Sequence, residues 1–381
     1  MTRLQDRSLY FATDKDLFDL MTSAKKRISI DVILELTRDR GIFLSQENSR
    51  EDLVNYVCLL PHDYHDLQLL LEQTESPSRK EKTTFATIDE NVSMEKLRTA
   101  IREVEQERAE RCGEVYISSV QDDGHFELEV GYTNVDYGKT RLRQKLFREA
   151  KIEFELEENN ATIRFPDNDK SREIIDAVVA KLSQSTNESL IPRKIDLSML
   201  TSAQHRTLFF TEMIKCIDGY SLADVTKVDV DRRLTPGLLS SDLDNEDDSD
   251  EYTTVESDEM LGIVQRALLQ GEGLLQSPEY QSLRDRGFYI CNIVWLAQQS
   301  TPSGSRVEFS ASLSDPETGT GFRYAVRGIY RRKADGNLTK TARPVEVPEQ
   351  RVLHRLLEAA AWEAVSRAQQ IQSEGTIGEE S

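Results

Sequence analysis

The chain has 381 residues, of which 38% are hydrophobic and 30% charged, and its formal net charge is -20 at pH 7. This length favours two or three domains with packed cores. So negative a chain repels nucleic acid and anionic membranes at long range, which restricts nucleic-acid binding to local basic patches.

The N-terminal residues, the lack of long apolar segments and the spacing of the cysteines exclude further classes of protein. The first residues contain no apolar leader, and no window approaches 18 apolar residues, so we expect a cytoplasmic protein without a membrane partner. The four cysteines, at positions 58, 112, 216 and 291, lie far apart and form no CxxC pair. We therefore expect neither a disulfide framework nor a metal site, and no cofactor.

Residues 1–75 are expected to form a helical module. Aspartates can cap a first helix, Gly41 suits the end of a second, Ser49 can cap a third, and Asp63 can begin a fourth. These helices are expected over 17–23, 30–40, 50–59 and from 63 onward. The polar segment 75–83 has no hydrophobic period and is predicted to be a linker.

An α+β domain is expected over 84–235. Ser93 can cap a helix with Leu97, Ile101 and Val104 at helical spacing, and the Asp-Gly pair ending at Gly124 predicts a β-hairpin. Further strands are predicted at 139–145, 152–156 and 161–165, followed by helices over 169–182 and 202–218 and a short strand at 225–230.

The remaining chain is predicted to hold a linker, a second α+β domain and a tail. Residues 236–259 include a strongly acidic run that cannot pack a core, so they are expected to be an acidic linker. The domain over 260–372 is expected to begin with a helix near 260–269, to continue with strands at 288–296, 306–313, 322–332 and 338–347, and to close with a helix from Pro348. Residues 373–381 are expected to be a flexible tail.

The predicted fold class is α+β, with the helical module followed by two helix–antiparallel sheet–helix domains. Because 94–185 and 258–370 share this order of elements, a degenerate duplication is one hypothesis. The alternative is that helix–sheet–helix order simply recurs in α+β domains.

The helical module carries one family resemblance. A helix ending in Arg40-Gly41-Ile42, a short extended stretch, and a second helix that follows Ser49 and opens Arg50-Glu51-Asp52-Leu53 together resemble the SAP family of helix–extended–helix DNA-binding motifs. The resemblance implies that Arg40 and Arg50 contact DNA phosphates beside the positive end of the second helix. The alternatives are a small helical interaction module or a cap on the next domain.

Two basic segments are the second indication of nucleic-acid contact. On a strand, Lys139, Arg141, Arg143 and Lys145 would all face one side, because they lie two residues apart. A later set on the next basic strand comprises Arg323, Arg327, Arg331, Arg332 and Lys333, with Lys340 and Arg343 on the strand predicted after it. These cations predict a surface for DNA, RNA or another polyanion; the alternatives are a solvated sheet face or a site for an acidic region.

Motifs for catalysis are weak. Gly131 and Gly138-Lys139-Thr140 are separated by six residues rather than the four of a phosphate-binding loop. Residues 166–170 superficially resemble a PD-(D/E)xK nuclease site but more naturally begin a helix.

We therefore expect a non-enzymatic, nucleic-acid-associated subunit of an intracellular multi-protein assembly, in DNA or RNA processing or in defence. The alternatives are a protein–protein adaptor without nucleic-acid binding, or an enzyme without a recognisable motif, with nuclease chemistry as the nearest match.

Overall fold

The predicted α+β class is confirmed by the computed structural model, in which helices accompany a large antiparallel sheet. The structure describes residues 12–74, 82–89, 92–112, 114–122, 124–156, 160–186, 189–232, 265–301, 304–333 and 336–379. The chain divides into two compact units, which we describe separately. The first comprises residues 1–81, 101–120 and 127–151, and the second comprises residues 82–100, 121–126 and 152–381.

Four short helices form the core of the first unit. Their apolar faces enclose a cluster that includes Leu20, Ile33, Leu53 and Val57. The predicted caps are present at two of the helices: the Ser49 hydroxyl accepts the Asp52 amide, and Gly41 has a positive φ of 74° after the second helix. The helices are α1 (Asp14–Ser23), α2 (Ile30–Arg38), α3 (Arg50–Cys58) and α4 (Tyr64–Thr74).

The Ser49 cap gives a direct test of this local structure. Ser49→Ala removes the acceptor for the Asp52 amide at the start of α3, so we expect a loss of about 1 kcal/mol of helix stability. Hydrogen exchange should accelerate at the first amides of α3. Ser23→Ala is the control, because the Ser23 hydroxyl only donates within its own helix, to the Leu20 carbonyl. Equal exchange in the two variants would contradict the capping role.

Ten strands occur among the described residues, and they are hydrogen-bonded in the order β2-β3-β4-β5-β1-β10-β9-β8-β6-β7. The predicted hairpin is present, and Gly124 in its turn has a φ of 89° that other residues rarely adopt. The strands are β1 (Thr83–Ile88), β2 (Val115–Asp122), β3 (His125–Val135), β4 (Lys145–Leu156), β5 (Ala161–Pro166), β6 (Tyr220–Asp231), β7 (Arg266–Gln270), β8 (Tyr289–Gln299), β9 (Arg306–Asp315) and β10 (Thr320–Tyr330).

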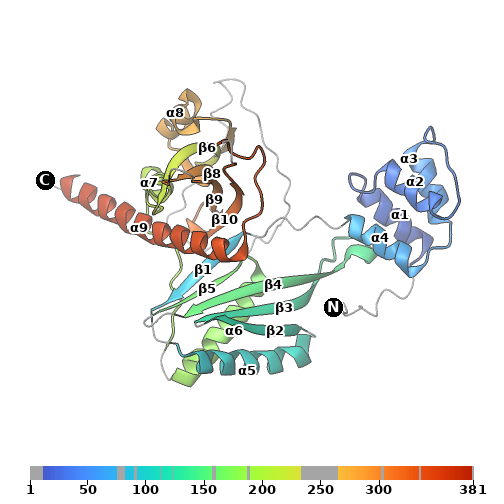
Figure 1. Ribbon diagram of the computed structural model, residues 1–381, viewed down its shortest axis with the longest axis horizontal. Helices are drawn as coiled ribbons and strands as arrows, with labels where there is room; N and C mark the ends of the chain where they lie inside the picture. The colour runs from blue at the N-terminus through green and yellow to red at the C-terminus, as the bar shows by residue number, and fades with distance from the viewer. Residues whose placement is uncertain are drawn as a thin grey trace. The chain divides into compact units, whose positions relative to one another are not determined.

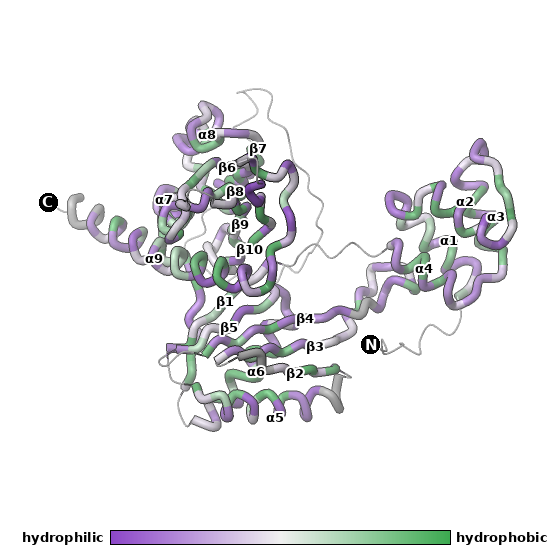
Figure 2. The backbone as a smooth tube through the Cα atoms, viewed as in Figure 1, coloured by the Kyte–Doolittle hydropathy of each residue, from purple (hydrophilic) through white to green (hydrophobic). Residues whose placement is uncertain are grey.

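The largest core lies in the second unit, on the sheet face covered by α7 (Ala203–Lys215) and α9 (Val347–Glu379) (Figure 1). Trp295 of β8 and Phe309 of β9 are fully buried there, with ring centroids 5.6 Å apart. Along α9, hydrophobic and hydrophilic residues alternate with the helical period (Figure 2), so that Leu353 and Leu357 face the core. The other helices are α5 (Met94–Cys112), α6 (Asp169–Thr186) and α8 (Pro278–Asp285).

Three sequence predictions about the C-terminal half need correction. Where a helix is expected near 260–269, the described residues Arg266–Gln270 form strand β7. The strand expected at 338–347 is reduced to isolated bridges such as Ile329 to Arg343. Helix α9 continues to Glu379, through the segment expected to be a flexible tail.

The acidic linker predicted at 236–259 lies outside the described residues. The strand before it, β6, pairs with β7 and β8, which follow it. Chain on both sides of the acidic segment thus contributes to one sheet rather than to the two separate sheets that the sequence predicted.

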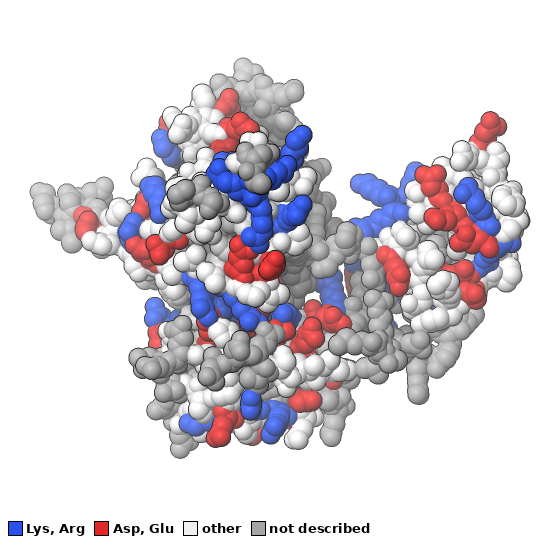
Figure 3. All heavy atoms as spheres, in the orientation of Figure 1, with Lys and Arg blue, Asp and Glu red and all other residues white. Residues whose placement is uncertain are grey.

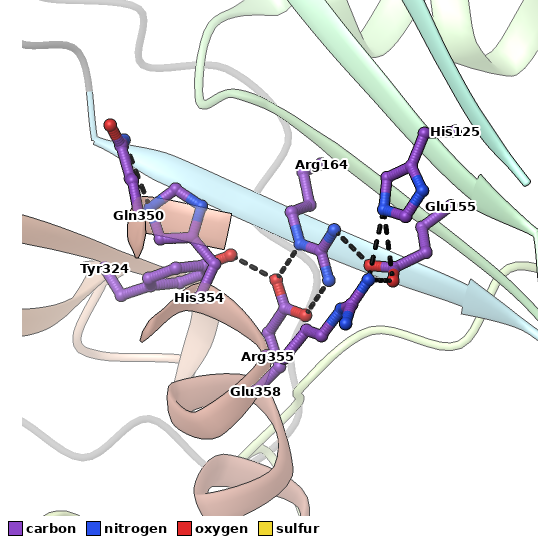
Figure 4. A network of polar contacts seen from close by, with 8 residues as sticks. All are labelled: His125, Glu155, Arg164, Tyr324, Gln350, His354, Arg355 and Glu358. Atoms are coloured by element: carbon purple, nitrogen blue, oxygen red, sulfur yellow. Dashed lines mark hydrogen bonds and ion pairs between the residues drawn. The ribbon is translucent and has the colours of Figure 1, made fainter. Parts of the chain in front are cut away.

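A buried ionic network fixes α9 against the sheet (Figure 4). Arg164 of β5 is only 3% exposed and donates two hydrogen bonds of 2.6 Å to Glu358 of α9. Its third bond, also 2.6 Å, reaches Glu155 of β4. The hydroxyl of Tyr324 donates to Glu358, and Arg355 forms an ion pair with Glu155. The charges of two arginines therefore neutralise those of two glutamates. We interpret the network as a structural element rather than as a ligand-binding site.

The titration properties of the network follow from its burial. Burial tends to lower the pKa of Arg164, but the hydrogen bonds and charge of Glu358 outweigh it and raise that pKa. Burial tends to raise the pKa of Glu155, and the hydrogen bond from Arg355 together with the charge of Arg164 brings it below its usual value. His354, packed edge-on against Tyr324, has its pKa lowered to about 3 by burial and by Arg164.

Candidate nucleic-acid interface

The two arginines of the SAP-like segment are both used inside the first unit. Arg50, at the start of α3, donates through Nη2 to the carbonyls of Met21 and Ile28, each at 2.8 Å. Arg40 donates to the Pro61 carbonyl at 2.5 Å and forms an ion pair with Asp66. Helices α2 and α3 are joined by turns and irregular backbone. Both arginines of the SAP-like segment have intramolecular partners.

The first basic segment is not a strand, so the prediction that its cations share one face is wrong. Lys139 lies in a turn, Arg141–Arg143 form one 3-10 turn, and β4 begins only at Lys145. The Asp136 carboxylate accepts the Gly138 amide at 2.9 Å, which favours the turn.

Two side chains anchor this turn to the helices of the first unit. Leu142 is buried in the helical core, and Arg141 donates to Asp16 at 2.6 Å. Burial of Leu142 in the helical core therefore favours the 3-10 turn over the predicted strand.

The later basic residues belong to the second unit. Arg327 on β10 lies 3.6 Å from Glu308, and Arg331 donates to Glu349 at 2.6 Å. Arg332 instead donates to the Gly336 carbonyl at 2.9 Å and forms no ion pair with a carboxylate of the described residues. The three predicted residues are thus close in the chain but differ in how far their charges are neutralised.

The connection between β10 and α9 concentrates exposed positive charge. From position 331 to 343 the sequence contains five basic residues and one acidic residue. Figure 3 shows basic side chains gathered over the part of the molecule where Figure 1 places β8–β10 and this connection. We call its four exposed cations the connection patch: Arg332, Lys333, Lys340 and Arg343.

The connection patch is held in place by its backbone. Bridges join Arg332 to Leu338 and Ile329 to Arg343, so the segment returns against the end of β10. Lys333, Lys340 and Arg343 make no ion pair with any carboxylate of the described residues. Cations that are exposed, close together and not neutralised are suited to phosphate contacts. Sequence reasoning noticed these residues but placed Lys340 and Arg343 on a strand.

The described part of the chain contains no group of three or more His, Cys, Asp or Glu side chains placed to hold a metal ion. Within the same residues, no helix is long and apolar enough to cross a bilayer. No protein-family model matches the sequence, and no curated protein matches it significantly. Function is therefore inferred from the side-chain chemistry of the described surface.

Proposed function

We propose that this protein is a non-enzymatic, nucleic-acid-associated subunit that contacts DNA or RNA phosphates through the connection patch. The observation that carries the proposal is that these cations are exposed and lack carboxylate partners among the described residues, whereas Arg40, Arg141 and Arg331 have them. With a net charge of -20, binding depends on this local field and should therefore be strongest at low salt.

A triple charge reversal tests this proposal. Lys333→Glu/Lys340→Glu/Arg343→Glu is expected to weaken binding to single- and double-stranded DNA and RNA by roughly tenfold or more in 50 mM salt. It should also reduce the slope of log affinity against log salt by about 0.9 on duplex DNA, or about 0.7 on single strands, for each phosphate that the variant no longer neutralises. Fluorescence anisotropy at several salt concentrations measures both quantities.

Two matched variants carry the same change in charge, from -20 to -26, at other places. Lys96→Glu/Arg98→Glu/Arg102→Glu places it on exposed residues of α5 and controls for bulk charge. Lys15→Glu/Lys25→Glu/Lys26→Glu places it on exposed residues of the first unit. If this variant weakens binding and the connection-patch variant does not, the contact belongs to the first unit instead. Absence of binding by the wild type at low salt would refute nucleic-acid association.

A protein–protein adaptor is the second candidate, and exposed apolar residues of the first unit favour it. Tyr56 and Leu59 lie three residues apart at the end of α3, where they share one side, and Tyr64 and Phe43 are also exposed. Leu59 is 73% and Phe43 81% exposed. Neighbouring exposed apolar side chains typically mark a contact with another protein, and the pair Tyr56 and Leu59 is of this kind.

A further inference from the structure

A row of polar residues crosses four neighbouring strands of the second unit. Arg323 of β10 pairs with Ser312 of β9, Ser312 with Asn292 of β8, and Asn292 with Asp229 of β6. Residues directly opposite each other in an antiparallel sheet point to the same face. Their neighbours Tyr324, Ala311 and Ile293 belong to the core, so the row lies on the face opposite to α7 and α9. We call these four residues, together with Lys82, the polar row.

Two cations of the polar row converge on one neutral oxygen. The Lys82 ammonium donates to the Ser312 hydroxyl at 2.8 Å, and Nε of Arg323 donates to the same oxygen at 3.2 Å. Ser312 is 1% exposed and accepts both bonds, which leaves its own proton available for an acceptor. Lys82 forms no ion pair with a carboxylate of the described residues. Burial and the adjacent charge of Arg323 lower the pKa of Lys82 to about 8.

The other side of the row offers acceptors without donors. The Asn292 amide donates to Oδ2 of Asp229 at 2.9 Å, which fixes the orientation of both groups. Oδ1 of Asn292 and Oδ1 of Asp229 are then buried without a hydrogen-bond donor among the described residues. Lys227 is 3.9 Å from the latter oxygen, which is beyond hydrogen-bonding distance. Buried acceptors of this kind are costly unless a donor reaches them.

A pocket adjoins the row through Asp167. Oδ1 of this buried carboxylate accepts from Arg172 at 2.5 Å, while Oδ2 lies 3.7 Å from Arg323 and has no hydrogen-bond donor among the described residues. Asp167 also lines a pocket of about 350 Å³ together with Arg172, Lys194, Ser314 and Thr84. This volume lies at the lower end of the range of small-molecule sites.

The charges of this region select the class of ligand. Lys82, Arg323 and the Ser312 hydroxyl present donors at one place, which suits an oxyanion. The unpartnered oxygens of Asn292, Asp229 and Asp167 on either side require hydroxyl or amine donors. A metal ion is disfavoured, because two cations occupy the centre and the described acids form no metal-binding group. A phosphate that carries hydroxyl groups satisfies both requirements.

We propose that the polar row and the adjoining pocket bind a sugar phosphate, with the phosphate on Lys82, Arg323 and Ser312 and a sugar hydroxyl on the unpartnered Oδ2 of Asp167. The ligand is either a free sugar phosphate or the phosphorylated end of a nucleic acid. This inference does not rest on the connection patch. Arg323 lies near the start of β10, whereas the cations of the patch follow its last residue, Tyr330.

Calorimetric titration of the full chain with ribose 5-phosphate at constant ionic strength tests the proposal. We expect one site, with ribose alone binding more weakly. Lys82→Gln and Ser312→Ala should each weaken binding by about tenfold or more, since each loses a charge-assisted bond. Lys96→Gln, a change of the same charge at an exposed lysine, should bind like the wild type. Two variants are used so that a folding defect in one leaves the other informative.

Proton uptake provides a readout that a purely structural role of Lys82 would not give. A bound phosphate favours the ammonium form of Lys82, so near pH 8.5 binding by the wild type should take up protons. Titration in buffers of different ionisation enthalpy measures this uptake, and Lys82→Gln should abolish it.

Paired oligonucleotides with a 5′-phosphate or a 5′-hydroxyl distinguish the two sources of the ligand. A preference for the phosphate end that Lys82→Gln removes identifies nucleic-acid ends, whereas ribose 5-phosphate binding without that preference identifies a free sugar phosphate. Charge reversal of the connection patch should weaken the binding of both oligonucleotides equally, so failure of one proposal is separable from failure of the other.

The polar row is not the site if the wild type shows no binding to about 10 mM ribose 5-phosphate, or if binding survives both Lys82→Gln and Ser312→Ala.

Discussion

Arg164→Met is expected to lower the free energy of unfolding of the second unit by about 3–5 kcal/mol, because it leaves Glu155 and Glu358 buried without their shared cation. Arg164 supplies all three of its hydrogen bonds at 2.6 Å inside the protein. Methionine fills a similar length but neutralises neither carboxylate. The loss is therefore mainly the cost of unpaired buried charge.

Tryptophan fluorescence during denaturant unfolding measures this effect in the correct unit. Trp295 and Trp362 are the only tryptophans of the chain, and both belong to the second unit. Arg164→Met/Glu358→Met should cost less than the single change, because one unpaired carboxylate is removed with its partner. Arg367→Met breaks exposed ion pairs to Glu212 and Glu363, which solvent screens, and should leave the unfolding curve almost unchanged. A similarly small effect of Arg164→Met would contradict the role assigned to the network.

Much of the secondary structure could be predicted because its signals are local. Ser49 caps a helix within three residues of itself, Gly124 is required by the turn in which it lies, and Leu353 and Leu357 repeat with the period of α9. Strand β7 shows where local signals fail. Its sequence, Arg-Ala-Leu-Leu-Gln, favours a helix by intrinsic propensity, but pairing of Leu269 with Val228 makes it a strand.

The candidate sites could not be predicted from local signals, because their residues come together only in the fold. Arg164 and Glu358 are 194 residues apart, and Lys82 and Ser312 are 230 apart, so no spacing in the sequence connects them. Positive charge could be located from the sequence, but its partners could not. Arg40 and Arg331 are paired with acids, whereas Lys333 and Lys340 have no acidic partner among the residues that the structure describes, and only the fold separates these cases.

Acidification is expected to destabilise the second unit through His354, which cannot accept a proton in the folded state without losing stability. It faces Arg164 of β5 and Tyr324 of β10, with Glu358 and Gln350 on its own helix. Its Nδ1 is buried and has no hydrogen-bond partner among the described residues. Burial and Arg164 lower its pKa to about 3, against about 6.5 in the unfolded chain.

The direction of the pH effect follows from this difference. Above pH 6.5 neither state binds the proton, and the contribution of His354 to stability is complete. Between pH 6.5 and 3 the unfolded chain binds a proton that the folded chain does not, so stability falls as the pH falls, by roughly 3 kcal/mol at pH 4.5. The loss continues until the pH reaches the folded-state pKa.

His354→Leu isolates this contribution from the carboxylates that titrate in the same range. The variant keeps an uncharged side chain at position 354, so its stability should fall less steeply between pH 7.5 and 4.5 than that of the wild type. The two curves, followed by tryptophan fluorescence, should therefore converge or cross as the pH decreases. Glu155, whose pKa also lies below its usual value, contributes equally to both and cancels in the comparison. Parallel curves would show that His354 is protonated in the folded protein, and that the charge of Arg164 beside it does not control its titration.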